Sequence, residues 1–363
     1  VLFRSEIAGI PIALPMLDIH TIGAGGGSLA WIDEAGLPQV GPESAGAMPG
    51  PVCYGQGGDI PAVTDANLLL GRIPHAARLA GRMQLDWDAA HGAFTRYGEK
   101  LGLTAEQAAD AVIRIAEEHM AGALRVVSVQ RGFNPGDFSL LCFGGAGGLH
   151  ACALAEKLAM KRVIFPLASG AFSALGMLAG RQQSEFSRSR PTPLLKGALD
   201  QLQGIFAELE REAAQAMQGL KLTYQRNVDI RYAGQGFHLT VAMQNDLDGM
   251  RDAFELEHQR AYGHKLNRPV ELMTVRLTAF VDQSELRLPE LPAFESELEA
   301  CAYSTIYGEG EVPQFLRSDI GPESVVSGPA LIVEDTSTLW LASGWKIQCS
   351  MHGHLILDRC DDC

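Results

Sequence analysis

A short segment in the middle of the chain limits the possible folds more than any other. Its pattern predicts an apolar strand over 138–143, a tight glycine loop over 144–148, a helix over 149–158 and a second strand over 162–165. A strand, loop, helix and strand in direct succession form the repeating unit of layered α/β domains. We therefore predict an α/β fold with at least one helix packed on a sheet.

The loop inside this unit is a candidate nucleotide-binding element. It consists of Gly144, Gly145, Ala146, Gly147 and Gly148. A glycine loop between a strand and a helix presents backbone N–H groups that can hold an anion or a nucleotide. The loop lacks the Gly-Lys-Ser/Thr of a P-loop, and it does not fit a dinucleotide fingerprint because His150 takes the place of the third glycine. Close packing between helix and strand is the alternative reason for the glycines.

A second glycine-rich stretch runs from Asp18 to Ser28 and contains Gly25, Gly26 and Gly27. Glycines at this density allow tight turns and a close approach of the backbone to a ligand. A dinucleotide fingerprint is excluded here too, since Ser28 stands at the third glycine position. The residues after it, Leu-Ala-Trp-Ile-Asp-Glu-Ala-Gly, also predict a strand and a turn, not a helix.

Asp18 and His20 lie two residues apart at the start of this stretch. On a strand, such residues point to the same face. A carboxylate and an imidazole arranged in this way can position a water molecule, hold a substrate group or bind a metal. We predict them as catalytic residues and as candidate metal ligands. The alternative is a structural hydrogen bond that stabilises the glycine-rich hairpin.

The turn-rich tract from Gly41 to Gly58 is long for a loop in a compact domain, and ordered loops of this length are often functional. It contains Cys53, for which a buried structural thiol is favoured over a nucleophile because no histidine stands at a suitable spacing. Asp65, just beyond it, is a candidate catalytic residue or a capping residue for the helix that follows.

Composition sets outer limits on function. The 363 residues carry a formal net charge of −14, which argues against nucleic acid or an anionic membrane as a partner. No apolar run approaches the roughly 20 residues of a spanning helix, and no signal peptide is recognisable. The 7 cysteines are an odd number and widely scattered, so we expect reduced thiols and a cytoplasmic location.

The pattern along the chain predicts three successive domains, over residues 1–185, 186–295 and 296–363. The first contains a long helix over about 104–129, which begins with a Thr-Ala-Glu-Gln capping box. The second alternates helices with strands, as in an α+β domain, and the third is a small β-rich tail.

Several motifs, taken in order, resemble the hydantoinase A/5-oxoprolinase family over nearly the whole chain. They are Asp-Ile-His-Thr-Ile-Gly-Ala-Gly-Gly-Gly-Ser, Val-Gly-Pro-Glu-Ser-Ala-Gly, Pro-Gly-Pro-Val-Cys-Tyr-Gly, Val-Thr-Asp-Ala-Asn-Leu with Leu-Gly-Arg, Phe-Gly-Gly-Ala-Gly, Ser-Ala-Leu-Gly, Arg-Tyr-Ala-Gly-Gln and Gly-Pro-Ala-Leu-Ile-Val-Glu. The family includes the ATP-dependent N-methylhydantoinase and 5-oxoprolinase and the ATP-using subunit of acetone carboxylase.

The resemblance implies part of an actin/sugar-kinase/Hsp70-like (RNase H-like) ATPase domain that uses ATP and Mg²⁺, with Mn²⁺ or Zn²⁺ as alternative metals. It implies that ATP phosphorylates the carbonyl oxygen of a cyclic amide, and that a hydantoinase B-type large subunit is the partner. It further implies that residues 144–147 line the nucleotide, and that the loop with Gly25–Ser28 and the loop with Cys53 and Tyr54 face the cleft.

Two departures from the family pattern bear on these expectations. Gly148 stands where the family usually has proline, and the two Asp-containing phosphate loops are expected upstream of residue 1. We therefore expect the isolated chain not to turn over ATP. Two other functions stay open: the ATP-using subunit of a carboxylase that activates a ketone, and a nucleotide-binding assembly subunit whose partner carries the catalysis.

Overall fold

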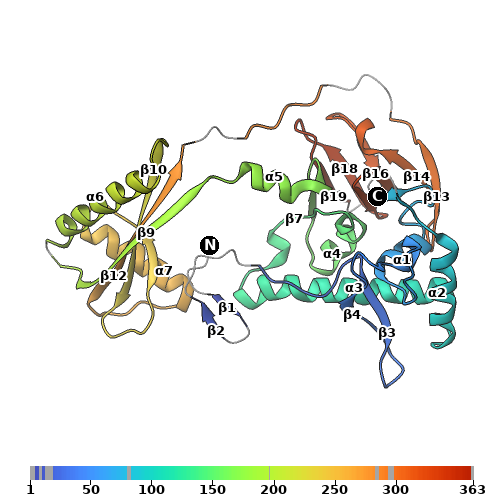
Figure 1. Cartoon of the computed structure of the whole chain (residues 1–363), viewed down its shortest axis with the longest axis horizontal. Coiled ribbons are helices and arrows are strands. Elements are labelled where there is room, and N and C mark those ends of the chain that lie inside the picture. Colours follow the sequence, from blue (N-terminus) through green and yellow to red (C-terminus); the bar gives the residue numbers. More distant parts are fainter. Residues whose placement is uncertain are drawn as a thin grey trace. The chain divides into compact units, whose positions relative to one another are not determined.

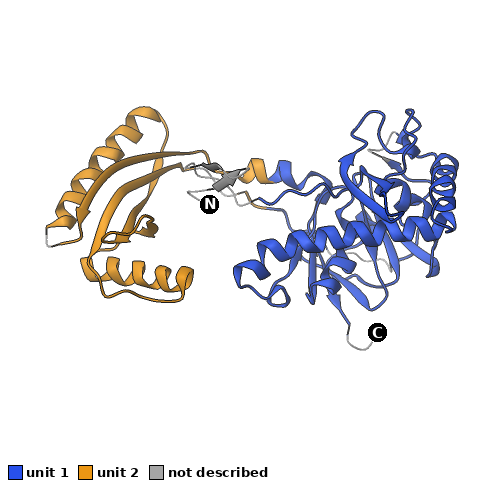
Figure 2. Cartoon of the chain, turned by 90° about the horizontal axis from the view of Figure 1, so that it is seen from below, with its two compact units in different colours: residues 1–175, 288–363 blue, residues 176–287 orange. Residues whose placement is uncertain are grey.

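The computed structural model describes residues 5–7, 10–12, 19–79, 83–195, 197–282, 286–292 and 298–360 (Figure 1). The chain forms two compact units (Figure 2), and the first is built from two separate stretches of sequence. Unit 1 comprises residues 1–175 and 288–363, and unit 2 comprises residues 176–287.

Unit 1 contains most of the helices and strands. Its strands are β1 (Ser5–Ile7), β2 (Ile10–Ile12), β3 (Ser28–Ile32), β4 (Pro38–Ser44), β5 (Arg78–Leu79), β6 (Met83–Gln84), β7 (Leu140–Leu141), β8 (Arg162–Phe165), β13 (Ala302–Ile306), β14 (Gly310–Leu316), β15 (Val325–Ser327), β16 (Ala330–Glu334), β17 (Ser337–Leu341), β18 (Trp345–Cys349) and β19 (Leu355–Arg359). Its α-helices are α1 (Val63–Leu69), α2 (Trp87–Glu99), α3 (Ala105–Val127) and α4 (Ala151–Lys157), and α5 (Phe172–Ala179) crosses the boundary to unit 2. Short 3-10 helices are η1 (Val52–Tyr54), η2 (Val129–Arg131), η3 (Pro135–Asp137), η4 (Gly147–Leu149), η5 (Ser169–Ala171) and η6 (Arg317–Asp319).

Two sheets of unit 1 share one hydrophobic core. The five-stranded sheet has the order β15-β18-β19-β8-β7, and the four-stranded sheet has the order β13-β14-β16-β17. Alternate residues of both sheets, among them Phe165, Ile332, Leu339, Trp345 and Leu357, pack with α4 in this core. Since strand side chains alternate between the two faces of a sheet, this pattern buries one face of each sheet.

The first unit also contradicts the predicted third domain. Strand β19 pairs antiparallel with β8, with Leu355 opposite Phe165, and an Arg162–Asp358 ion pair at 2.7 Å joins the same two strands. The carboxyl-terminal strands therefore complete a sheet that begins in the first half of the chain. Residues 296–363 do not form a separate tail, because their apolar faces are buried against β8 and α4.

The predicted strand–loop–helix–strand unit is present, with shorter elements than expected. Strand β8 occupies the predicted residues 162–165, whereas β7 contains two residues where the pattern predicted 138–143. β7 lies at the edge of the sheet and pairs with β8 alone, which limits the ladder it can form. The predicted helix over 149–158 is divided into η4 and α4.

A layer of helices lies against this region, and its longest member is α3, which packs against α1, α2 and α4 (Figure 1). The predicted capping box is confirmed, because the Thr104 hydroxyl accepts the N–H of Gln107 at 3.2 Å and the Gln107 side chain accepts the N–H of Thr104 at 3.0 Å. Within the described parts of the chain, every helix is too short or too polar to span a bilayer.

Unit 2 contains both helices and strands, and it comprises residues 176–287, whereas the pattern predicted an α+β domain over 186–295. Its elements are β9 (Gln183–Pro193), α6 (Ala198–Ala216), β10 (Leu222–Tyr232), β11 (Leu239–Ala242), α7 (Leu247–Tyr262) and β12 (Val270–Val281). The four strands form an antiparallel sheet in the order β11-β10-β12-β9. Apolar residues of α6 and α7, such as Phe206 and Phe254, pack with Val275 and Leu277 of β12 in the core of this unit.

Candidate functional site

The main cavity of unit 1 lies where the two predicted glycine-rich segments meet. Its volume is about 570 Å³, and residues of several separate segments line it: Gly26, Gly27, Tyr54, Thr64, Asn67, Ile73, Ala76, Ala77, Arg78, Gly145, Ala146, Leu149, Leu316, Val333, Glu334, Asp335, Thr336, Ser337 and Thr338. A volume of this size suits a small-molecule or cofactor site. The cavity therefore contains part of each predicted loop and several residues that the pattern did not single out.

The loop at 144–148 is divided between the wall of the cavity and the packing of the helix on the sheet. Gly145 and Ala146 line the cavity. Gly148 is buried under β17, and a Cβ atom there would lie 2.6 Å from the carbonyl oxygen of Thr338. At Gly147 a Cβ would lie 3.1 Å from Sγ of Cys142. Close packing thus explains the second half of the loop, whereas its first half faces the cavity.

Gly144 gives the loop its turn. Its φ of 93° lies in the region that favours glycine, and its N–H donates to the carbonyl oxygen of Ser169 at 2.9 Å. Ser169 also bonds through its hydroxyl to Glu334 and Ser337, at 2.9 and 2.8 Å. The buried Ser169 therefore ties the glycine loop to the turn between β16 and β17.

The stretch with Gly25, Gly26 and Gly27 is a compact loop ahead of β3. The Ser28 hydroxyl accepts the N–H of Gly25 at 2.9 Å and donates to the carbonyl oxygen of Gly23 at 3.1 Å. Gly26 comes so close to α1 that a Cβ would lie 2.8 Å from Oγ1 of Thr64, and 3.7 Å from Cβ of Ala146. Ser28 is thus a structural residue of the loop, and Gly26 brings the two glycine-rich segments into contact.

Asp65 has a structural environment. Its carboxylate is fully buried in the first turn of α1 and accepts three backbone hydrogen bonds. The donors are the N–H groups of Val52, Cys53 and Ala62, at N···O distances of 3.1, 2.7 and 2.7 Å. This geometry supports the capping alternative over the predicted catalytic role, because the carboxylate is occupied by the backbone of η1 and of the helix start.

Cys53 and Tyr54, which were both predicted to face the cleft, have different environments in the structure. Tyr54 lines the cavity, whereas the Cys53 side chain is fully buried in a small apolar cluster with Leu68, Leu85 and Ala90. Burial and the neighbouring carboxylate of Asp65 raise the pKa of the Cys53 thiol far above its ordinary value. Cys53 does not line the cavity, and the favoured interpretation as a structural thiol agrees with this environment.

The burial of Cys53 predicts its chemical behaviour. We expect iodoacetamide at pH 8 to alkylate the exposed Cys301 in the folded protein and to leave Cys53 unmodified, because alkylation requires an accessible thiolate. Mass spectrometry of peptides after timed labelling measures both rates. Labelling of Cys53 at the rate of Cys301 would contradict the structural assignment, and labelling in denaturant provides the control for intrinsic reactivity.

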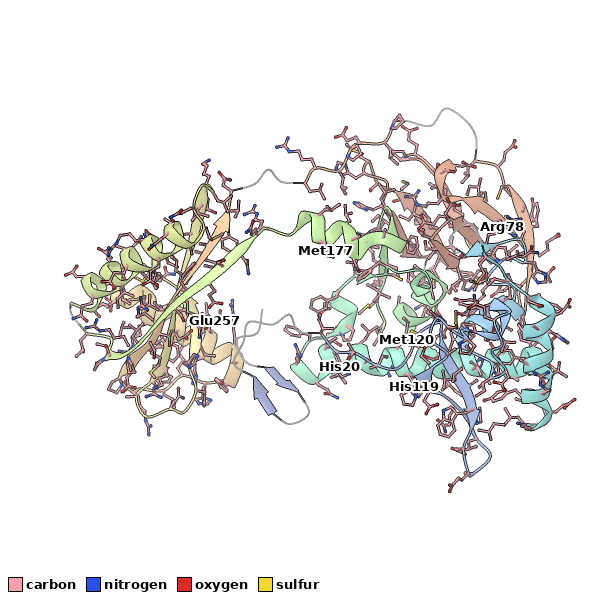
Figure 3. The ribbon with its side chains drawn as sticks, viewed as in Figure 1. His20, Arg78, His119, Met120, Met177 and Glu257 are labelled. Atoms are coloured by element: carbon pink, nitrogen blue, oxygen red, sulfur yellow. The ribbon has the colours of Figure 1, made fainter. Side chains whose placement is uncertain are left out.

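The predicted Asp18–His20 pair is only partly described. Asp18 lies outside the described residues, and the exposed His20 precedes the glycine loop and does not line the main cavity (Figure 3). Among the residues that the structure describes, no three His, Cys, Asp or Glu side chains are grouped to hold a metal ion. The pair stays a prediction.

Sequence reasoning missed the turn between β16 and β17, which forms one wall of the cavity. Glu334, Asp335, Thr336 and Ser337 contribute two carboxylates and two hydroxyls there. The only sequence signal was the family-like Gly-Pro-Ala-Leu-Ile-Val-Glu motif that ends at Glu334, to which no role was assigned. The other missed charge is Arg78, an exposed residue after α1 that also lines the cavity (Figure 3).

Asn67 is a further missed residue of the cavity wall. It is fully buried, and its Nδ2 donates to the carbonyl oxygen of Val63 at 3.0 Å. Its Oδ1 has no hydrogen-bond partner among the described residues. A buried acceptor without a partner is costly, so this oxygen is suited to a donor from a ligand or a water molecule.

The cavity combines three kinds of surface. Ile73, Leu149, Leu316 and Val333 form apolar walls, the acidic turn and Arg78 contribute charge, and the glycine segments contribute exposed backbone. Such a site can hold a ligand with a flat apolar part and a polar, charged part.

The sequence of this chain is similar to those of hydantoinases, oxoprolinases and related enzymes. Residues 1–186 match the hydantoinase/oxoprolinase family profile. The chain is 32% identical to caprolactamase subunit alpha of Pseudomonas jessenii, over 94% of this chain and 53% of the relative. It is 33% identical to a 5-oxoprolinase of Pestalotiopsis fici, over 99% of this chain and 30% of the relative. It is 29% identical to the acetophenone carboxylase gamma subunit of Aromatoleum aromaticum, over 99% of this chain and 53% of the relative.

Two solved structures share the fold. The crystal structure of the ATP-dependent caprolactamase from Pseudomonas jessenii matches with a TM-score of 0.82 at 29% identity, over 98% of this chain and 55% of that chain. The nucleotide-free acetone carboxylase matches with a TM-score of 0.83 at 23% identity, over 98% of this chain and 54% of that chain. The predicted fold class, α/β with a partial actin/sugar-kinase/Hsp70-like ATPase domain, is confirmed.

The chain spans about half the length of the caprolactamase and acetophenone carboxylase subunits that it matches. The profile match covers residues 1–186, which is more than half of this chain. This chain belongs to the hydantoinase/oxoprolinase family.

Proposed function

We propose that this chain is part of the ATP-using subunit of an enzyme that opens cyclic amides, and that the main cavity of unit 1 binds the nucleotide. The observation that carries the proposal is the meeting of Gly26 and Gly27 with Gly145 and Ala146 in one cavity of about 570 Å³. Both segments were predicted to face a nucleotide cleft. The membership of ATP-dependent enzymes in the family supports the choice of ATP.

The composition of the walls suits a nucleotide. The apolar surfaces of Ile73, Leu149 and Val333 can pack against a base, and the free acceptor of Asn67 can receive a hydrogen bond from a base or a ribose. The exposed backbone at Gly145 and the Arg78 guanidinium are suited to the phosphates. These residues would bind and orient ATP, which is the main requirement for phosphoryl transfer.

The turn between β16 and β17 fits a magnesium ion bound with the nucleotide. Mg²⁺ prefers oxygen ligands, and Asp335 and Thr336 supply a carboxylate and a hydroxyl on the cavity wall. When bound, Mg²⁺ neutralises charge on the phosphates. Glu334 is less suited as a ligand, because its carboxylate already accepts hydrogen bonds from Ser169 and Ser337.

The reaction we propose transfers the terminal phosphoryl group of ATP to the amide oxygen of a cyclic amide. The bond from phosphorus to ADP breaks, and a bond from phosphorus to the amide oxygen forms. Water then adds to the activated carbon, and the ring carbon–nitrogen bond breaks as the nitrogen takes up a proton, which leaves an acyl phosphate. A second water molecule attacks this acyl phosphate, so that phosphate leaves and the carboxylate forms. We further propose a hydantoinase B-type large subunit as partner, since the caprolactamase relative is one subunit of its enzyme. We also propose a cytoplasmic location.

A carboxylase function is the second candidate, favoured by the 29% identity to the acetophenone carboxylase subunit over 99% of this chain. A ketone would then replace the cyclic amide as the phosphoryl acceptor or co-substrate. The cavity does not distinguish the two functions, because both require ATP.

Substrate-dependent phosphate release tests the proposal. The full-length subunit would be co-expressed with its large partner subunit and supplied with ATP, Mg²⁺ and, in turn, caprolactam, 5-oxoproline, hydantoin or acetone with bicarbonate. We expect phosphate release that depends on one of the cyclic amides. Release that acetone alone stimulates would favour the carboxylase, and release unaffected by all four would refute substrate activation.

A further inference from the structure

Glu117 of α3 is a buried carboxylate that connects two segments of the chain. Its Oε1 lies 3.4 Å from Nδ1 of His150 and 3.5 Å from Nη1 of Arg72. Glu117 and His150 are 4% and 2% exposed. None of the three residues lines the main cavity, so the network lies behind its walls.

Each partner of Glu117 is adjacent in sequence to a wall of the cavity. His150 directly follows Leu149, which lines the cavity together with Gly145 and Ala146. Arg72 directly precedes Ile73, the first lining residue of the segment that ends at Arg78. A single carboxylate oxygen on a long helix therefore links the glycine-loop wall to the wall formed after α1.

These two walls need an anchor from outside the cavity. Gly145 and Ala146 on one side, and Ala76 and Ala77 on the other, have almost no side chain with which to fix their own positions. The His150 ring has no partner at Nε2 among the described residues, so its contact with Glu117 is the polar interaction that orients it. A buried carboxylate is costly unless its partners stay in place, which makes such a network rigid when complete.

We propose that Glu117 is a positioning residue for the main cavity, which holds the glycine-loop wall and the wall after α1 at a fixed separation. The role in ligand binding rests on the proposed nucleotide function. The link between residues 72–78 and residues 145–150 is independent of that function. The positions of the two walls then depend on α3, although no residue of α3 lines the main cavity.

The substitution Glu117→Gln tests this role. Glutamine keeps the size of the side chain but removes the charge that favours both Arg72 and the imidazole. The matched control is Glu118→Gln, because Glu118 is the next residue of the same helix and pairs with Lys157 at 2.6 Å, away from the cavity. Two readouts are needed: the affinity for Mg²⁺-ATP by titration calorimetry, and amide hydrogen exchange followed by mass spectrometry.

We expect Glu117→Gln to weaken Mg²⁺-ATP binding about tenfold and to speed exchange in both 72–78 and 145–150, with α2 unchanged. Glu118→Gln should alter neither readout. His150→Asn should weaken binding in the wild-type background and add little to Glu117→Gln, since residues of one network are not additive. A purely structural role would speed exchange throughout unit 1 and not only in these two segments.

The two possible failures are distinguishable. If the wild-type full-length subunit does not bind Mg²⁺-ATP, the proposed nucleotide function fails, and the exchange data still decide whether Glu117 links the two segments. If Glu117→Gln leaves exchange unchanged in either segment, the positioning role is overturned whatever the affinity. Should Glu117→Gln fail to fold, His150→Asn carries the exchange test, because it changes the other partner of the same contact.

Discussion

Replacement of Asp65 by alanine is expected to lower the free energy of unfolding of unit 1 by about 4 kcal/mol. The carboxylate accepts hydrogen bonds from three buried backbone N–H groups, on η1 and at the start of α1. A hydrogen bond to a charged group contributes about 1.5–3 kcal/mol, and each N–H left without a partner adds a desolvation cost. Urea denaturation followed by circular dichroism measures the loss.

The control is Asp59→Ala, which removes an exposed aspartate from the loop between η1 and α1 and should change the stability by less than about 0.5 kcal/mol. If the alanine variant does not fold, Asp65→Asn provides a milder test, with an expected loss of about 2 kcal/mol because asparagine keeps one acceptor oxygen. A stable Asp65→Ala protein that no longer supports phosphate release in the full complex would instead restore the predicted catalytic role.

The contrast between Asp65 and α3 shows which features the sequence could predict. Helix α3 was predicted within two residues, because its capping box and apolar spacing are local signals. Strand β8 was predicted at its observed bounds, because a short apolar run is also a local signal. The role of Asp65 depends on Val52 and Cys53, 13 and 12 residues away, and a carboxylate in sequence does not reveal whether backbone or substrate will occupy it.

Pairing between distant segments accounts for the features that were missed. The ion pair that joins β8 to β19 links residues 196 positions apart, and no local pattern in the carboxyl-terminal strands indicates that they complete a sheet of unit 1. The acidic turn of the cavity is likewise held to the glycine-loop region by a bond between Ser169 and Glu334, 165 positions apart. The glycine segments were recognisable because their density is a local anomaly, whereas the turn has an ordinary composition.

The proposed function accounts for different reactions within one family. If the cavity binds ATP, its apolar walls, glycine backbone and charged groups serve the nucleotide, whichever group receives the phosphoryl group. A fold determines how a site is built, but the acceptor is selected by residues that contact it. We therefore expect the choice between a cyclic amide and a ketone to depend on residues outside this cavity.

The largest effect on binding is expected from Ala146→Phe. Ala146 lines the main cavity and is partly exposed, so a phenylalanine side chain at this position can extend into the cavity. The ring would occupy part of the volume of about 570 Å³ and compete with the ligand. We expect the Kd for Mg²⁺-ATP to rise at least about tenfold, or about 1.4 kcal/mol, with the melting temperature unchanged. Titration calorimetry and thermal unfolding measure the two quantities.

The matched control is Ala35→Phe, which places the same ring in the exposed turn between β3 and β4 and should leave the Kd unchanged. If Ala146→Phe binds Mg²⁺-ATP as tightly as the wild type, the nucleotide does not occupy this cavity. The position of Gly145 and Ala146 would then reflect packing alone, as it does at Gly148. A loss of binding confined to Ala146→Phe would assign the cavity to the nucleotide, because the two variants differ only in where the ring is placed.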